Sequence, residues 1–88
     1  KPPLIWSDSK VAFAEMVYAF HASGVFNSSQ ADIKTVTETL AKTFNVKIGN
    51  IYKMLEEIRL RKKNRTVFLD HLKNNLIQRM DRDDEQAL

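Results

Sequence analysis

FNVKIGNIYKMLEEIRLRKKNR, residues 44–65, is the stretch of this chain that predicts its fold. Large apolar side chains recur in it at the spacing of one helix face: Ile48, Ile51, Tyr52, Leu55 and Ile58. This period predicts a helix with one buried stripe. Residues 45–47 precede that helix as a three-residue turn, and Asn45 tolerates the left-handed backbone that ends a preceding helix. We therefore expect a helix-turn-helix.

Length and composition restrict the chain to one small folded domain. It has 88 residues, 43% of them hydrophobic, with two glycines and two prolines, a composition typical of a helical domain with a single core. Cysteine is absent, which excludes disulfides and fits a cytoplasmic location. No apolar run is long enough to span a membrane. The chain begins Lys-Pro-Pro without methionine, so we expect a fragment of a longer protein with residues 1–6 as a lead-in.

Two further helices are predicted before residue 44. The first starts near Ser9, with Trp6 packed over its first turns, and ends at Gly24. The second runs from Ile33 to Phe44, with Asp32 as its preferred N-cap and Ser29 as an alternative, earlier cap. Between them, residues 25–26 (Val25 and Phe26) are a candidate for a minimal strand pair.

A fourth helix is predicted from Val67 to about Arg82, after which residues 83–88 are expected to fray. Its predicted core stripe consists of Phe68, Leu69, Leu72, Leu76, Ile77 and Met80. The predicted fold is thus a single all-α domain, residues 1–88, of four helices with a helix-turn-helix formed by the second and third. The candidate strand pair leaves a winged-helix variant open.

Positive charge is concentrated at the end of the predicted third helix and in the residues that follow it. The net charge is +3, but residues 47–80 carry nine basic side chains against three acidic ones. Such a local positive field steers a polyanion toward the surface. We expect contacts to a DNA backbone from Lys34, Lys47, Arg59, Arg61, Lys62, Lys63 and Arg65. The alternative is a solvated helix end, where basic side chains are also common because they interact favourably with the helix dipole.

Base contacts are expected from Asn50 and Lys53, on the outer face near the start of the third helix. Asparagine suits adenine and lysine suits guanine. Tyr52 continues the apolar stripe and is expected in the core. His21 and His71 are fifty residues apart without metal-ligand spacing, so we expect no metal. No Ser, His and acid pattern and no glycine-rich phosphate loop stands out, so we expect no cofactor and no enzymatic activity.

Several segments of the chain, in order, carry a family resemblance: residues 31–34 (ADIK), 48–52 (IGNIY), 57–62 (EIRLRK) and 65–70 (RTVFLD). In these segments the chain resembles the C-terminal part of the RteC family, regulators carried by conjugative transposons of Bacteroides. The resemblance implies a transcriptional activator of the transposon's excision genes, induced in the tetracycline-resistance cascade. It also implies binding to double-stranded DNA in the promoter region of those genes, and an N-terminal domain missing here.

A helical protein-interaction module without direct DNA contact remains the alternative function. In that case the fourth helix would use Leu69, Leu72, Leu76 and Met80 to pair with itself, forming a homodimer, or with the missing N-terminal domain.

Overall fold

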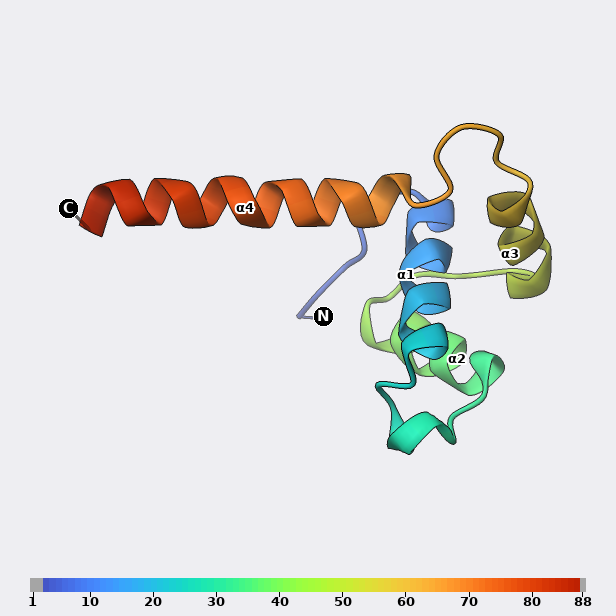
Figure 1. Cartoon of the computed structure of the whole chain (residues 1–88). Coiled ribbons are helices and arrows are strands. Elements are labelled where there is room, and N and C mark those ends of the chain that lie inside the picture. Colours follow the sequence, from blue (N-terminus) through green and yellow to red (C-terminus); the bar gives the residue numbers. More distant parts are fainter. Residues whose placement is uncertain (1–2, 88) are drawn as a thin grey trace.

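The computed structural model describes residues 3–87 and is built from helices (Figure 1). Four α-helices follow one another, with a short 3-10 turn, η1 (Asn27–Ser29), after the first: α1 (Lys10–Ser23), α2 (Ile33–Thr43), α3 (Ile51–Arg59) and α4 (Val67–Ala87). The predicted all-α class is confirmed.

The predicted strand pair at Val25 and Phe26 is wrong, because residues 3–87 contain no strand. Val25 and Phe26 instead lie in the turn between α1 and η1. The physical reason is local backbone geometry. Gly24 has a left-handed φ of 67°, and residues 27–29 also have positive φ values, so the chain coils here and cannot extend.

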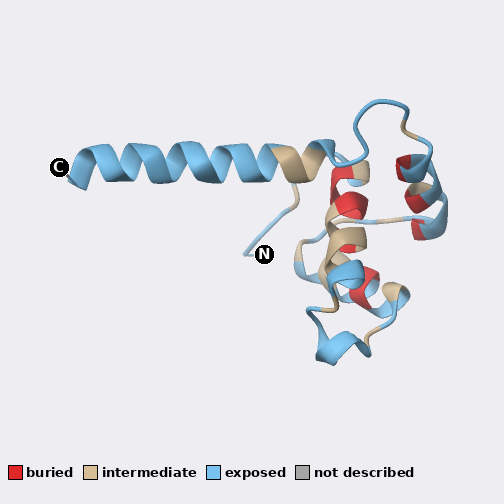
Figure 2. Cartoon of the chain, in the orientation of Figure 1, coloured by how far each residue is buried: buried red, intermediate tan, exposed pale blue. Residues whose placement is uncertain are grey.

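Helix α1 is the centre of the fold, and α2, α3 and α4 each pack against it. Its ends form as predicted. The Ser9 hydroxyl accepts a hydrogen bond from the Ala12 backbone N–H at 3.1 Å, and Gly24 ends the helix in the left-handed conformation. Phe13 and Val17 of α1 are completely buried. Figure 2 shows that the buried residues gather on α1 and on those parts of α2 and α3 that pack against it.

The end of α2 also forms as predicted. Asn45 takes a φ of 53°, its N–H bonds to the Lys42 carbonyl, and the Val46 N–H bonds to the Ala41 carbonyl at 2.9 Å. These two bonds make a Schellman motif. The start of α2 is likewise confirmed, because the Asp32 carboxylate accepts a hydrogen bond from the Thr35 N–H at 2.8 Å.

The predicted start of the third helix is wrong. Helix α3 begins at Ile51, three residues later than Ile48, and the connection from α2 therefore exceeds the three-residue turn that we expected. Asn50 decides this boundary, because its side-chain Oδ1 accepts a hydrogen bond from the Lys53 N–H at 3.2 Å. Ile48 still packs against the buried residues that α1 shares with α3 and with α2, but it does so from the connection.

Trp6 joins three parts of the fold, as its predicted packing role requires. Its ring meets Phe13 of α1 at 5.4 Å and Phe68 of α4 at 5.7 Å between centroids, both edge to face. It also stacks on Phe44, at 6.3 Å, and its backbone N–H bonds to the Phe44 carbonyl at 2.8 Å. These contacts fix residues 6–9 to the domain.

Helix α4 leaves the rest of the domain after its first turn (Figure 1). Phe68, Leu69 and Asp70 are half-buried, and residues 71–87 are exposed (Figure 2). The predicted intramolecular core stripe is therefore wrong for Leu72, Leu76, Ile77 and Met80, because no other described element lies over them. No helix within residues 3–87 is both long and apolar enough to cross a bilayer.

The predicted fraying of residues 83–88 differs from the structure, in which α4 continues through Ala87. An ion pair within the helix, from Arg79 Nε to Asp83 at 3.1 Å, supports this last part of α4. Residue 88 and residues 1–2 of the predicted lead-in lie outside the described residues.

Candidate nucleic-acid interface

The segment between α3 and α4 is tied to α1 by one buried carboxylate. Glu15 lies on α1 and is 2% exposed. Its Oε1 forms an ion pair with Arg61 at 2.5 Å, and its Oε2 accepts a hydrogen bond from the Leu69 N–H at 2.8 Å. The guanidinium of Arg61 also donates to the Arg65 carbonyl at 3.0 Å. The segment is thus fixed at its start, at its end and at the first turn of α4.

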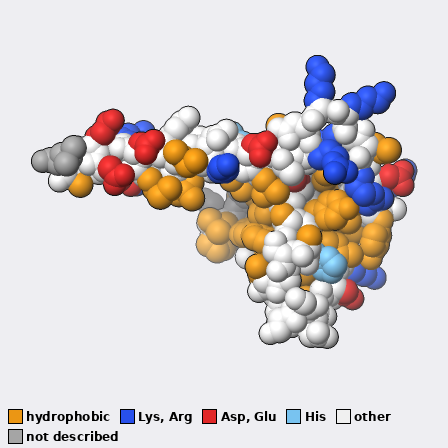
Figure 3. Space-filling view, viewed as in Figure 1, with side chains coloured by type: hydrophobic (Ala, Val, Ile, Leu, Met, Phe, Trp, Pro, Cys, Tyr) orange, Lys and Arg blue, Asp and Glu red, His pale blue; other side chains and the backbone are white. Residues whose placement is uncertain are grey.

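This segment together with Arg59, the last residue of α3, spans residues 59–66 and is called the basic loop below. Arg61 is half-buried in its ion pair, whereas the other four basic side chains are exposed: Arg59, Lys62, Lys63 and Arg65. The ion pairs within residues 3–87 are Glu15–Arg61 and Arg79–Asp83, so these four cations have no ion-pair partner there. Figure 3 shows lysine and arginine side chains gathered over this end of the molecule.

The outer face of α3 carries one basic and two acidic side chains. Ile51, Leu55 and Ile58 are buried against α1, which leaves Tyr52, Lys53, Glu56 and Glu57 exposed. Tyr52 is 57% exposed, so its predicted place in the core is wrong. The later start of the helix explains the difference, because the buried face follows positions 51, 55 and 58 and Tyr52 lies beside it. Positive charge on α3 is therefore confined to its two ends.

Asn50 and Lys53 lie together at the first turn of α3, where base contacts were predicted. The Asn50 side-chain oxygen caps the helix with one of its two lone pairs, and its amide NH₂ forms no hydrogen bond within the described residues. Lys53, three residues later in the same turn, is exposed. Lys34, Asn50 and Tyr52 also line an open hollow of about 430 Å³ between α2 and the start of α3, and Lys47 is exposed in the connection.

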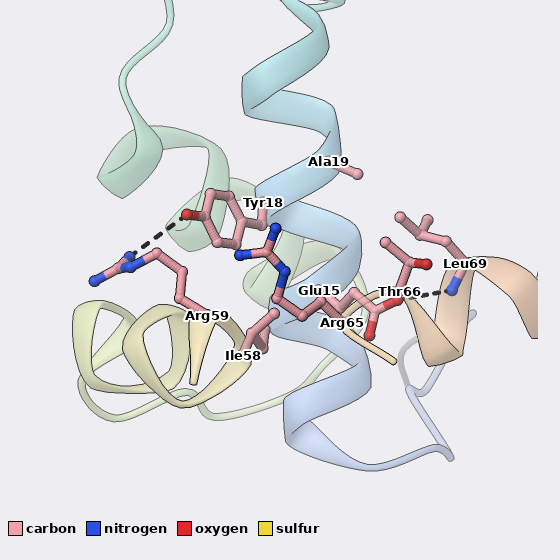
Figure 4. Close-up of a pocket in the computed structure, with 8 residues that line it drawn as sticks. All are labelled: Glu15, Tyr18, Ala19, Ile58, Arg59, Arg65, Thr66 and Leu69. Atoms are coloured by element: carbon pink, nitrogen blue, oxygen red, sulfur yellow. Dashed lines mark hydrogen bonds between the residues drawn. The ribbon is translucent and has the colours of Figure 1, made fainter. Parts of the chain in front are cut away.

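A second hollow, of about 220 Å³, lies where α1 and α3 meet the start of α4 (Figure 4). Arg59 and Arg65 line it, and the Arg59 guanidinium donates to the Tyr18 hydroxyl at 3.5 Å. Glu15 also lines this hollow, but both of its oxygens are already bonded to the protein. No group of three or more potential metal ligands occurs in the described part of the chain.

The sequence interpretation missed two features of this region. Glu15 was given no role, although a single acid inside the apolar run of α1 signals a buried partner. Arg61 was grouped with the exposed cations, whereas in the structure it is half-buried in an ion pair with Glu15. The later start of α3 also had a signal in the sequence, because asparagine is a preferred N-cap and Asn50 directly precedes Ile51.

Comparison with known proteins gives one family. The family model described as RteC protein matches residues 1–84, nearly the whole chain. No curated protein and no solved structure matches the chain.

Proposed function

This chain belongs to the RteC family, and from this premise we propose that it binds double-stranded DNA as part of a transcriptional activator of transposon excision genes. Membership suggests a regulatory role in the excision of Bacteroides conjugative transposons. The finer proposal adds the DNA contact, the promoter region of the excision genes as target, and a helix-turn-helix-like use of α2 and α3.

The basic loop is the observation that carries this proposal. Arg59, Lys62, Lys63 and Arg65 are exposed and free of ion pairs within the described residues. The ion pair between Glu15 and Arg61 holds the backbone that carries them. A loop that is already ordered loses less conformational entropy on binding. Four fixed cations on one exposed segment therefore suit the phosphate backbone of a duplex.

Base recognition is proposed for the first turn of α3. Lys53 is exposed there and carries the positive charge nearest to the start of the helix, where helix-turn-helix proteins read base edges. A lysine at this place suits the acceptors of guanine in the major groove. We assign Asn50 mainly to capping, because its oxygen already accepts the Lys53 N–H and would have to accept a second hydrogen bond in a bidentate contact to adenine.

Fluorescence anisotropy tests this function directly. The chain is titrated into a labelled duplex from the promoter region of the excision genes and into a scrambled duplex, at low and at physiological salt. We expect tighter binding to the promoter duplex and a loss of about 1–3 kcal/mol in Lys53→Ala. Arg82→Ala removes the same charge near the end of α4 and serves as the control. Equal affinity for both duplexes would leave only nonspecific binding, and no binding at low salt would contradict the proposal.

A second candidate function rests on a different observation. Leu72, Leu76, Ile77 and Met80 of α4 are exposed, which is unusual for side chains of this size so close together on one helix. A helical interaction module would use this surface. Protein pairing through apolar side chains is nearly insensitive to moderate salt, whereas DNA binding weakens steeply, so salt dependence separates the two functions.

A further inference from the structure

Helix α4 has an apolar face that no described part of the chain covers. Its 21 residues extend for about 32 Å, and only the first turn is packed. Leu69, Leu72, Leu76 and Met80 follow one another at spacings of three, four and four, and so form one stripe along the helix. Leu76, in the middle of this apolar stripe, is 58% exposed. Figure 3 shows hydrophobic side chains along the side of α4 that faces away from the basic loop.

The charges of α4 are divided between its two halves. Residues 67–80 carry two basic side chains and one acidic side chain, and residues 81–87 carry one basic and four acidic side chains. A parallel pair of such helices would place acid beside acid. An antiparallel pair separates the two acidic halves and places each beside the half of the other helix that carries Lys73. Opposite helix dipoles also favour the antiparallel arrangement. The antiparallel arrangement therefore avoids the repulsion between the two acidic halves and brings a lysine to each of them.

From this charge pattern we infer that the occupant of the apolar stripe is α4 of a second copy of the chain, packed antiparallel about a two-fold axis. Placing the axis between Leu76 and Met80 packs Leu76 of each copy against Met80 of the other. Leucine and methionine at such positions give the knobs-into-holes packing of helix pairs. The two-fold symmetry repeats every contact, as in most homodimers.

This arrangement also pairs charges along the flank of the stripe. Lys73 and Asp84 are eleven residues apart, close to three full turns, so they lie on the same flank of the helix. In an antiparallel pair the same flanks of both copies meet. Lys73 of each copy then lies beside Asp84 of the other, and the dimer gains this attraction twice. The pairing sets the orientation and the register of the two helices.

The dimer is measured without DNA, by sedimentation equilibrium of the chain over concentrations up to about 500 µM. An interface made by a single exposed helix of each copy is among the smaller specific protein interfaces, so we expect a Kd in the micromolar range. Leu76→Glu, at an exposed position, should keep the helical circular dichroism and raise the Kd at least about 100-fold, because each dimer loses two buried leucines. Gln78→Glu adds the same charge on the opposite face of α4 and should leave the Kd within about threefold.

Charge exchange tests the orientation. Lys73→Glu and Asp84→Lys should each weaken the homodimer, and an equimolar mixture of the two variants should recover dimerisation, because each then meets an opposite charge in the other. A wild-type chain that stays monomeric at 500 µM would overturn the inference and leave the stripe to another protein. A dimer that is unaffected by Leu76→Glu, or variants whose mixture shows no recovery, would overturn it as well. Because no DNA is present, failure here and failure of the proposed function are separate results.

Discussion

Glu15 of α1 holds Arg61 of the basic loop through an ion pair that joins residues 46 positions apart in the sequence. The same carboxylate accepts the Leu69 N–H in the first turn of α4, where a negative charge also interacts favourably with the helix dipole. One side chain of the central helix thus positions the basic loop and the direction in which α4 leaves the domain. The surface that we propose for DNA and the surface that we propose for dimerisation both depend on it.

Removing Arg61 should destabilise the domain strongly. Arg61→Met leaves the buried Glu15 carboxylate without its counter-charge, which typically costs about 3–5 kcal/mol of the free energy of unfolding. Urea denaturation followed by circular dichroism measures this loss. Lys62→Met, the exposed neighbour, is the matched control and should change the stability by less than about 0.5 kcal/mol.

A double variant separates charge burial from hydrogen bonding at the same site. Glu15→Gln keeps an oxygen that accepts the Leu69 N–H but carries no charge. The combination of Glu15→Gln with Arg61→Met should therefore be more stable than Arg61→Met alone. If the double variant were less stable, the uncompensated charge would not be the cause of the loss.

Gly24 should not tolerate alanine. Its φ is 67°, and a Cβ built there would lie 2.1 Å from the Ser29 Oγ and 3.2 Å from the Ser29 Cβ. The left-handed conformation alone costs a residue with a Cβ about 1–2 kcal/mol, so Gly24→Ala should lower the free energy of unfolding by at least this amount. Gly49→Ala is the control, because its Cβ would meet no atom within 4 Å. A stability of Gly24→Ala equal to that of the control would refute the role given to this turn.

Asp32 gives the domain an acid-sensitive helix cap. Hydrogen bonds from Thr35, through its side chain first and then its backbone, hold the pKa of the Asp32 carboxyl below its ordinary value of 3.8. Because the pKa is lower in the folded state, the contribution to stability is present above pH 3.8 and is lost as the pH falls through the folded pKa. Asp32→Asn also caps but does not titrate there, so its stability should fall less than that of the wild type between pH 5 and pH 2. Parallel losses in both proteins would show that Asp32 does not contribute.

Asn50 should matter for the stability of α3 more than for DNA binding. Asn50→Ala removes the acceptor of the Lys53 N–H and should cost about 1 kcal/mol of stability, measured by urea denaturation. Serine caps a helix about as well as asparagine but lacks the amide. Asn50→Ser should therefore keep the stability and keep the affinity for the promoter duplex within about twofold. A large loss of affinity in Asn50→Ser would instead assign Asn50 to base recognition.

The parts of the fold that sequence predicted correctly depend on local bonds. Ser9 and Asp32 begin their helices, and Asn45 ends α2, through hydrogen bonds to residues three or four positions away. The start of α3 was missed because Ile48 fits the helical period, although it packs against the core from the connection. There the cap at Asn50 overrides the period.

The remaining errors concern contacts that a single element cannot reveal. A stripe such as that of α4 shows that a helix has an apolar face, but not what covers it, and the chain leaves Leu72 and Leu76 exposed. Likewise, the run of basic residues gave no reason to separate Arg61 from its neighbours. Only the packing of α3 and α4 on α1 brings Arg61 to Glu15.

The salt dependence of DNA binding tests the central claim most directly. Four cations on phosphates predict that log Kobs falls with log salt at a slope of about −3.6, and that Lys62→Ala with Lys63→Ala halves the slope to about −1.8. The pair Arg79→Ala with Arg82→Ala removes the same charge from α4 and should leave the slope unchanged. That pattern is the result we predict for the promoter duplex in anisotropy titrations between 50 and 200 mM salt. Equal slopes for the wild type and the loop variant, or no binding at the lowest salt by a folded chain, would contradict the role of the basic loop.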